Sequence, residues 1–201
     1  MIPHPTGEKR AAGTIMDTVR DIERLFAVAG KVLAAVGLRA GQRCVDFGCG
    51  YGNYTIPLAR LVGPQGEVLA LDRDTGSLDR LADRLRRAGL ENVRILPVGD
   101  TPALPLEDAS ADGILLYDVL HDHYFSMKRR KALLEDVARV IRPGGRLSVF
   151  PNHMTDRQID EEVVARAGRL GFEQMEPYRG PLVHDDGVME GRILVLRKAM
   201  P

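Results

Sequence analysis

The sequence has no tryptophan, only two cysteines, no excess of charge of either sign and no long apolar run. Lys plus Arg and Asp plus Glu both number 28, whereas a general binder of nucleic acids or anionic membranes carries a basic excess. No apolar stretch approaches the roughly 20 residues that a membrane span needs, and residues 1–10 lack the apolar segment of a secretory signal. These absences predict a cytoplasmic location, no membrane binding and no general nucleic-acid binding.

The two cysteines, Cys44 and Cys49, lie five residues apart in a segment that is predicted to be extended. At about 3.3 Å per residue they are too far apart to form a disulfide. Their spacing does not match that of a zinc site either. Two free cysteines agree with a reducing compartment.

Three alternating glycines, Gly48, Gly50 and Gly52, end an apolar run at residues 44–47 and precede a helical pattern. An arrangement of strand, glycine turn and helix lets a nucleotide approach the backbone closely. A dinucleotide-binding fingerprint would have its third glycine at position 53, where this sequence has Asn53. The spacing by itself fits a bound nucleotide or a turn without any ligand about equally well.

Asp46 distinguishes between the possible ligands, because it stands two residues before the first glycine. Its carboxylate would repel a pyrophosphate on the turn but would attract an ammonium group. The carboxylate of the same ligand could then bind at the N-terminus of the following helix. These features favour S-adenosylmethionine and disfavour NAD.

With Asp46, this glycine segment resembles the class I S-adenosylmethionine-dependent methyltransferases, in particular the small-molecule type 11/25 group. The resemblance covers roughly residues 40–150 by motif and the tail by pattern alone. It implies S-adenosylmethionine as cofactor, a small-molecule methyl acceptor, and a cofactor loop of Asp46, Gly48, Cys49, Gly50 and Tyr51. It also implies a Rossmann-like, doubly wound α/β fold with a seven-stranded sheet, mostly parallel with an antiparallel C-terminal hairpin strand.

The pattern of the chain agrees with that fold. Strand patterns at 44–47, 67–71, 92–98, 113–120 and 146–150 alternate with helical patterns at 22–36, 54–62, 77–88, 126–141 and 155–171. Thr75 or Ser77 is expected to cap the third of these helices. Residues 172–178 and 192–197 follow as strands with no room for a helix between them, so they are expected to pair antiparallel as a hairpin.

We therefore expect residues 1–201 to form one methyltransferase domain, as a monomer or a homodimer. Residues 1–38 would be an N-terminal arm and helix, residues 39–151 the cofactor-binding core, and residues 152–201 a C-terminal helix and hairpin.

Polar residues at the ends of the predicted strands supply the other candidate cofactor contacts, since ligands of open α/β sheets bind beyond the carboxyl ends of the strands. By the resemblance, Asp72 accepts the ribose hydroxyls and Arg73 lies along the adenine. Asp100 and Thr101 bind the adenine, and the backbone of Tyr117 lines the methionine end. The alternative for either aspartate is an ordinary solvated cap or turn.

A catalytic base is needed only if the acceptor must lose a proton. His121 and His123 follow the fourth predicted strand, where the family places residues that face the substrate, and they are the candidate catalytic residues. The alternative is that they only pack the cleft. His123, Asp122, Asn152 and His153 could together hold a metal, but the Asp-Asn pair of metal-dependent relatives is missing, and we predict no metal. His184, in the expected hairpin loop, is taken as part of a solvated turn that borders the acceptor pocket.

Three other functions stay open at this point. The first is a methyltransferase that acts on RNA or protein, which the neutral charge disfavours. The second is a module that binds S-adenosylmethionine without turnover. The third is an NAD-dependent enzyme, which Asp46 and Asn53 disfavour.

Replacing His121 by alanine tests the predicted base. We expect His121→Ala to leave the dissociation constant for the cofactor unchanged in calorimetry and to lower the turnover number, because the acceptor would keep its proton. Full turnover of this variant at neutral pH would instead identify His121 as a packing residue.

Overall fold

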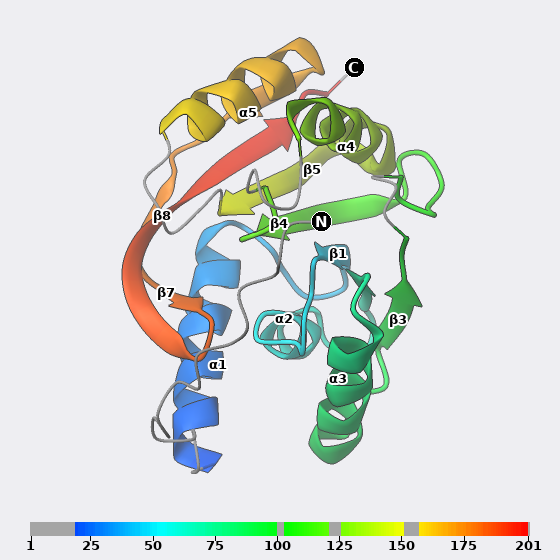
Figure 1. The fold of residues 1–201 in the computed structure, drawn as a ribbon, viewed down its shortest axis with the longest axis vertical. Coiled ribbons are helices and arrows are strands. Elements are labelled where there is room, and N and C mark those ends of the chain that lie inside the picture. Colours follow the sequence, from blue (N-terminus) through cyan, green and yellow to red (C-terminus); the bar gives the residue numbers. More distant parts are fainter. Residues whose placement is uncertain (1–18, 100–102, 121–125, 151–156, 201) are drawn as a thin grey trace, which may run out of the picture.

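The structure is a computed structural model and describes residues 19–99, 103–120, 126–150 and 157–200. The described residues form one mixed sheet in the order β3-β2-β1-β4-β5-β8-β6, with β7 paired to β8 (Figure 1). The parallel strands are β1 (Arg43–Phe47), β2 (Glu67–Asp72), β3 (Val93–Pro97), β4 (Ala111–Tyr117) and β5 (Ile141–Phe150). The antiparallel strands are β6 (Phe172–Gln174), β7 (Tyr178–His184) and β8 (Gly187–Lys198).

Helices cover both faces of the sheet (Figure 1). On one face lie α1 (Val19–Ala35), α2 (Thr55–Val62) and α3 (Thr75–Ala88). On the other lie α4 (Met127–Val140) and α5 (Arg157–Arg169). Because both faces are covered, β1, β2 and β4 are almost wholly buried and read as continuous apolar runs in the sequence.

The alternation of side chains along β1 decides which residues face which helices. Val45 and Phe47 pack in the core under α4 and α5, while Cys44 packs in the core under α1 and α2. Asp46 shares the face of Cys44, and so its carboxylate is directed at the N-terminal end of α2. The local strand geometry therefore aims this acid at the helix that follows the glycine turn.

The predicted α/β fold is confirmed, but the described residues form eight strands instead of seven, and the difference lies in the C-terminal tail. The segment expected to be a loop around Gly180 and Pro181 is β7, and β8 begins at Gly187, five residues earlier than its predicted start. The turn between them is only Asp185 and Asp186. Glycine and proline are tolerated here because the partner of β7 in the sheet is β8 alone among the described strands, which leaves β7 an edge strand.

Two element boundaries also differ from the prediction. The N-cap of α3 is Asp74, not Thr75 or Ser77, and its carboxylate accepts from the backbone N–H groups of Gly76 and Ser77. An aspartate is as good an N-cap as serine, so sequence alone did not separate them. The strand β5 starts at Ile141, directly after α4, although the helix was expected to end at residue 141 and the strand to begin only at residue 146.

The β7–β8 hairpin is bound to the glycine turn and to α2 by three hydrogen-bonded groups. The Tyr54 hydroxyl donates to the carbonyl of Val183 (3.1 Å) and accepts from its N–H (2.9 Å), and all these atoms are buried. The Asn53 side-chain amide donates to the Asp185 carbonyl (2.7 Å), and the Tyr51 hydroxyl donates to the Asp186 carboxylate (2.6 Å). The tip of the hairpin thus lies over the turn that follows β1.

Removing the Tyr54 hydroxyl tests this attachment. We expect Tyr54→Phe to lower the free energy of unfolding by about 1–3 kcal/mol, because the buried N–H and C=O of Val183 lose their partner. Denaturant titration measures the change. Tyr178→Phe is the matched control, because its hydroxyl donates to the Pro181 carbonyl at the surface, and it should change stability by less than about 0.5 kcal/mol. Equal losses in both variants would contradict the attachment.

Candidate active site

The strand order of the sheet reverses between β1 and β4, which are neighbours although β2 and β3 separate them in the sequence. Ligands of doubly wound folds bind at this switch point, beyond the carboxyl ends of the strands. Here Gly48 follows β1 and Asp118 follows β4. Two cavities open at this point, and both are lined by Gly48 and Asp118.

The first cavity has a volume of about 140 Å³ and lies between the glycine turn and the β7–β8 hairpin. Its wall is mixed, with acids, aromatic rings and loop backbone. The residues that line it are Asp46, Gly48, Cys49, Gly50, Tyr51, Asn53, Tyr54, Tyr117, Asp118, Phe150, Val183, His184 and Asp185.

The second cavity, of about 320 Å³, lies at the ends of β2 and β3. Asp72, Arg73 and Asp74 line it on one side, and Val98 and Gly99 on another. Of the predicted cofactor residues, Asp72 and Arg73 are therefore brought together here, while Asp46, Cys49, Gly50, Tyr51 and Tyr117 line the first cavity. Gly48 lines both cavities and lies at the boundary between them.

Gly48 and Gly50 have different roles in the turn. A Cβ on Gly48 would come within 2.1 Å of Val119 Cγ1, so only glycine lets the ends of β1 and β4 approach this closely. A Cβ on Gly50 would meet nothing within 4 Å, and the residue lines the first cavity. The backbone at Gly50 is thus open to a ligand, as the strand–turn–helix motif requires.

Asp46 is buried, with 3% of its surface exposed, and its carboxylate accepts from the Thr55 hydroxyl at 2.7 Å. Burial raises the pKa of Asp46 to about 6; the Thr55 hydrogen bond opposes this rise, and the nearby charge of Asp72 adds to it. A raised pKa means that the negative charge is poorly compensated in the free protein. A cation in the first cavity would compensate it.

Asp72 is fixed by two backbone groups. One oxygen accepts from the N–H of Gly50 (2.8 Å), and the other accepts from the N–H of Asp74 (2.9 Å). Each carboxylate oxygen can accept more than one hydrogen bond. The side chain is therefore held in place, and it still has lone pairs for hydroxyl groups of a ligand in the second cavity.

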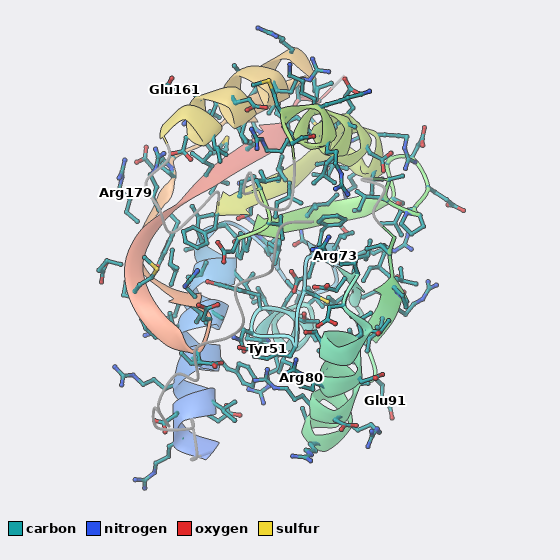
Figure 2. All side chains as sticks on the ribbon, in the orientation of Figure 1. Tyr51, Arg73, Arg80, Glu91, Glu161 and Arg179 are labelled. Carbon is teal, nitrogen blue, oxygen red and sulfur yellow. The ribbon has the colours of Figure 1, made fainter. Side chains whose placement is uncertain are left out.

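The aromatic residues of the first cavity hold each other in place. Tyr117 and Tyr54 pack edge to face at 4.7 Å, and the Tyr117 hydroxyl lies 2.6 Å from the Ser148 hydroxyl. Burial raises the pKa of Tyr117 well above its ordinary value and that of the Cys49 thiol as well, so both stay neutral. Tyr51 lies beside Arg80 (Figure 2), whose guanidinium is 5.6 Å from the centre of the ring.

Several predicted residues lie outside the described ones. These are Asp100 and Thr101 on the cofactor side, and His121, His123, Asn152 and His153 on the acceptor side. In the part of the chain that the structure describes, no group of three or more His, Cys, Asp or Glu side chains could hold a metal ion. The same described residues contain no helix that is long and apolar enough to cross a membrane.

Sequence reasoning missed a pair of residues in the first cavity. His184, expected in a solvated turn, ends β7 inside the cavity wall, with Nε2 3.0 Å from the Asp118 carboxylate. The signal was present only in part, because Asp118 falls inside the predicted fourth strand, residues 113–120, whereas β4 ends at Tyr117, one residue before it. Its partner lies 66 residues further on, and only the hairpin brings the two together.

The chemistry of these residues fits S-adenosylmethionine. A buried, poorly compensated carboxylate faces the first cavity, where the ammonium end would bind. Tyr54, the N-cap residue of α2, makes no side-chain cap hydrogen bond, and the positive end of the helix dipole favours an anion such as the ligand carboxylate there. An oriented acid in the second cavity suits a ribose.

Comparison with known proteins identifies the family. Residues 44–145, half of the chain, match the family model described as "Methyltransferase domain". The chain therefore belongs to the methyltransferase domain family. This confirms the resemblance to the class I S-adenosylmethionine-dependent methyltransferases.

Curated relatives and solved structures agree with this family assignment. Demethylmenaquinone methyltransferase of Staphylococcus aureus is 33% identical over 115 residues, which are 57% of this chain and 45% of that protein. The chain thus matches less than half the length of this relative. A SAM-dependent methyltransferase from Aquifex aeolicus has a similar fold (TM-score 0.66, 22% identity), with 87% of this chain and 91% of that chain covered. A SAM-dependent O-methyltransferase from Thermotoga maritima also has a similar fold (TM-score 0.63, 18% identity), with 86% of this chain and 65% of that chain covered.

The buried acid predicts a pH-dependent affinity. Below pH of about 6 a proton occupies Asp46 in the free protein and must leave before the carboxylate can pair with an ammonium group. We expect the dissociation constant for S-adenosylhomocysteine to fall by up to about tenfold per pH unit as the pH rises from 5 towards 6, and to level off above about 6.5. Isothermal titration at several pH values measures this.

Asp46→Asn and adenosine are the controls. The variant should bind more weakly at pH 7.5, and its affinity should not change between pH 5 and 7.5. Adenosine has no ammonium group to pair with Asp46, so its affinity for the wild type should not change between pH 5 and 7.5. A wild-type affinity for S-adenosylhomocysteine that is flat across pH 6 would exclude Asp46 from the contact.

Proposed function

We propose that the chain transfers the methyl group of S-adenosylmethionine to a small molecule, with the adenosyl part of the cofactor in the second cavity. The methionine end and the acceptor would share the first cavity. The observation that carries this proposal is the common boundary of the two cavities at Gly48 and Asp118. A ligand that extends past Gly48 would reach both the oriented Asp72 and the buried Asp46.

S-adenosylmethionine brings an already activated methyl group, so the protein mainly has to bind, orient and exclude water. Asp72 would accept the ribose hydroxyls, and its bonds to the backbone of Gly50 and Asp74 fix its direction. Asp46 would pair with the ammonium group, and the open backbone at Gly50 would let the ligand come close. The aromatic rings and the hairpin would keep water from the reacting atoms.

The acceptor side favours a small molecule. The described part of the first cavity is small, about 140 Å³, and the hairpin lines one side of it, which suits a compact acceptor more than a protein or RNA chain. The Staphylococcus aureus relative acts, by its name, on demethylmenaquinone. We propose demethylmenaquinone as the first acceptor to assay, together with methyl-labelling of a metabolite extract.

The alternative is a module that binds the cofactor without transferring its methyl group. It predicts the same calorimetric binding and no label in any acceptor. Calorimetry with S-adenosylmethionine, S-adenosylhomocysteine and NAD, followed by the transfer assay, separates the two. Binding of NAD in preference to both sulfur ligands would contradict the proposed function altogether.

Asp72→Ala tests the placement of the adenosyl part. We expect the affinity for S-adenosylhomocysteine to fall by about 2–3 kcal/mol, roughly 30- to 150-fold, because a pair of charge-assisted hydrogen bonds is lost. Asp79→Ala, which removes an exposed acid from α3, is the matched control and should bind like the wild type. Unchanged affinity in Asp72→Ala would remove this residue from the site.

A further inference from the structure

Arg84, a half-buried residue of α3, lies between two aromatic rings. Its guanidinium carbon is 5.2 Å from the centre of the Phe26 ring in α1 and 5.4 Å from the centre of the Tyr51 ring in the glycine turn. Figure 2 shows Tyr51 in the space between α1 and α3. A guanidinium within about 6 Å of a ring centre is attracted by the negative face of the ring. The two rings therefore keep the side chain of Arg84 in one place.

The guanidinium of Arg84 also binds the glycine turn by two hydrogen bonds. Its Nη1 donates to the backbone carbonyl of Tyr51 (2.8 Å) and to the side-chain oxygen of Asn53 (3.2 Å). Burial lowers the pKa of Arg84, and the nearby Tyr51 and Asp186 oppose this change. An arginine in a protein stays charged all the same. Both bonds are therefore charge-assisted, which makes them stronger than bonds between neutral groups.

The bond to the Tyr51 carbonyl fixes the plane of one peptide in the turn. On the other side of the same peptide, the N–H of Gly52 donates to the carbonyl of Cys49 (3.0 Å). The peptide unit is planar, so partners for both its C=O and its N–H determine its orientation. Loss of Arg84 would remove the partner on the carbonyl side and would allow this peptide to rotate.

The bond to Asn53 carries the effect of Arg84 to the β7–β8 hairpin. A carboxamide has one accepting and one donating end. Because the oxygen of Asn53 accepts from Arg84, its NH₂ group points to the hairpin and donates to the Asp185 carbonyl (2.7 Å). The ring of Tyr51, which lies beside the same guanidinium, donates from its hydroxyl to Asp186 (2.6 Å). One arginine thus orients both residues that bind the hairpin tip.

We propose that Arg84 is a positioning residue for the methionine end of the cofactor and acts through Tyr51 and Asn53. This inference rests on the proposed function and adds to it a residue of α3. Arg84 is not among the described residues that line the two cavities, whereas Tyr51 and Asn53 both line the first one and not the second. The effect of Arg84 should therefore be confined to the part of a ligand that binds in the first cavity.

A purely structural role of Arg84 predicts something else. Loss of a residue that only stabilises the fold would weaken all ligands of the protein to a similar extent. The hairpin is also bound through the Tyr54 hydroxyl and the backbone of Val183, and these bonds do not involve Arg84. A variant without the guanidinium is therefore expected to keep the fold and the second cavity.

The first experiment compares two ligands by isothermal titration. We expect Arg84→Met to raise the dissociation constant for S-adenosylhomocysteine by about tenfold or more, because the turn and the hairpin tip lose their charge-assisted bonds. The dissociation constant for adenosine, which has no amino-acid end, should stay within about twofold of the wild-type value. Retained binding of adenosine also shows that the variant is folded.

Arg84→Lys and Arg87→Met are the matched variants. Lysine keeps a cation and a donor but reaches less far, so Arg84→Lys should restore part of the affinity for S-adenosylhomocysteine. Arg87 is an exposed arginine three residues further along α3, and Arg87→Met should bind both ligands like the wild type. An equal loss for both ligands in Arg84→Met, or no loss for either, would overturn the proposal.

The second experiment tests the contact without any ligand. Denaturant titration gives the loss of stability in Arg84→Met, in Asn53→Ala and in the double variant. We expect the double variant to lose less than the sum of the two single losses, because both substitutions remove the same interaction. The losses in the pair Arg87→Met and Asn53→Ala should simply add. Additive losses in the Arg84 pair would contradict the contact on which the proposal depends.

The outcomes separate this inference from the proposed function. If the wild type binds S-adenosylhomocysteine and Asp72→Ala weakens it while Arg84→Met does not, the proposed function stands and Arg84 is not a positioning residue. If the wild type binds no sulfur ligand, the proposed function fails, and the role of Arg84 towards the cofactor fails with it. The double-variant experiment still decides in that case whether Arg84 holds the turn.

Discussion

The site depends on how closely the ends of β1 and β4 approach each other. The absent side chain of Gly48 lets the Val119 side chain occupy the space that a Cβ would need, and any other residue there would displace Val119. Since the strand order reverses at this pair, the approach creates the crevice from which both cavities open. Gly48 and Asp118 line both cavities because they are the first residues after these strands.

The buried charge at the end of β1 shows how function and stability oppose each other in this crevice. Alternation along the strand directs Asp46 to α2, where the Thr55 hydroxyl donates to its carboxylate. A charged acid in such a position lowers the stability of the free protein, since its pKa is raised by burial and the charged form is disfavoured. A bound cation would reverse this effect, so ligand binding and a fully ionised Asp46 would stabilise each other.

Much of the fold was predictable from the sequence because its signals are local. The apolar runs of β1, β2 and β4, the glycine turn and the helical periods each depend on neighbouring residues, and the structure confirms them. One error concerns a contact between distant parts of the chain, and another concerns a local helix cap. The strand β7 contains Gly180 and Pro181, and it is recognisable only from its pairing with β8. The choice of Asp74 over Thr75 as a cap depends on details of the backbone that composition does not specify.

The same reasoning explains which half of the site was predictable. The residues proposed for the cofactor lie in or next to the first four strands, where local motifs place them, and all of them fall within the family match at residues 44–145. Phe150, Val183 and His184 lie outside that match, and the structure brings them to the first cavity only through β5 and the hairpin. The part of the chain that would choose the acceptor is therefore the part that the family match does not cover. For this reason the acceptor has to be inferred from the chemistry of this chain's own cavity, in which an acid, a histidine and aromatic rings meet.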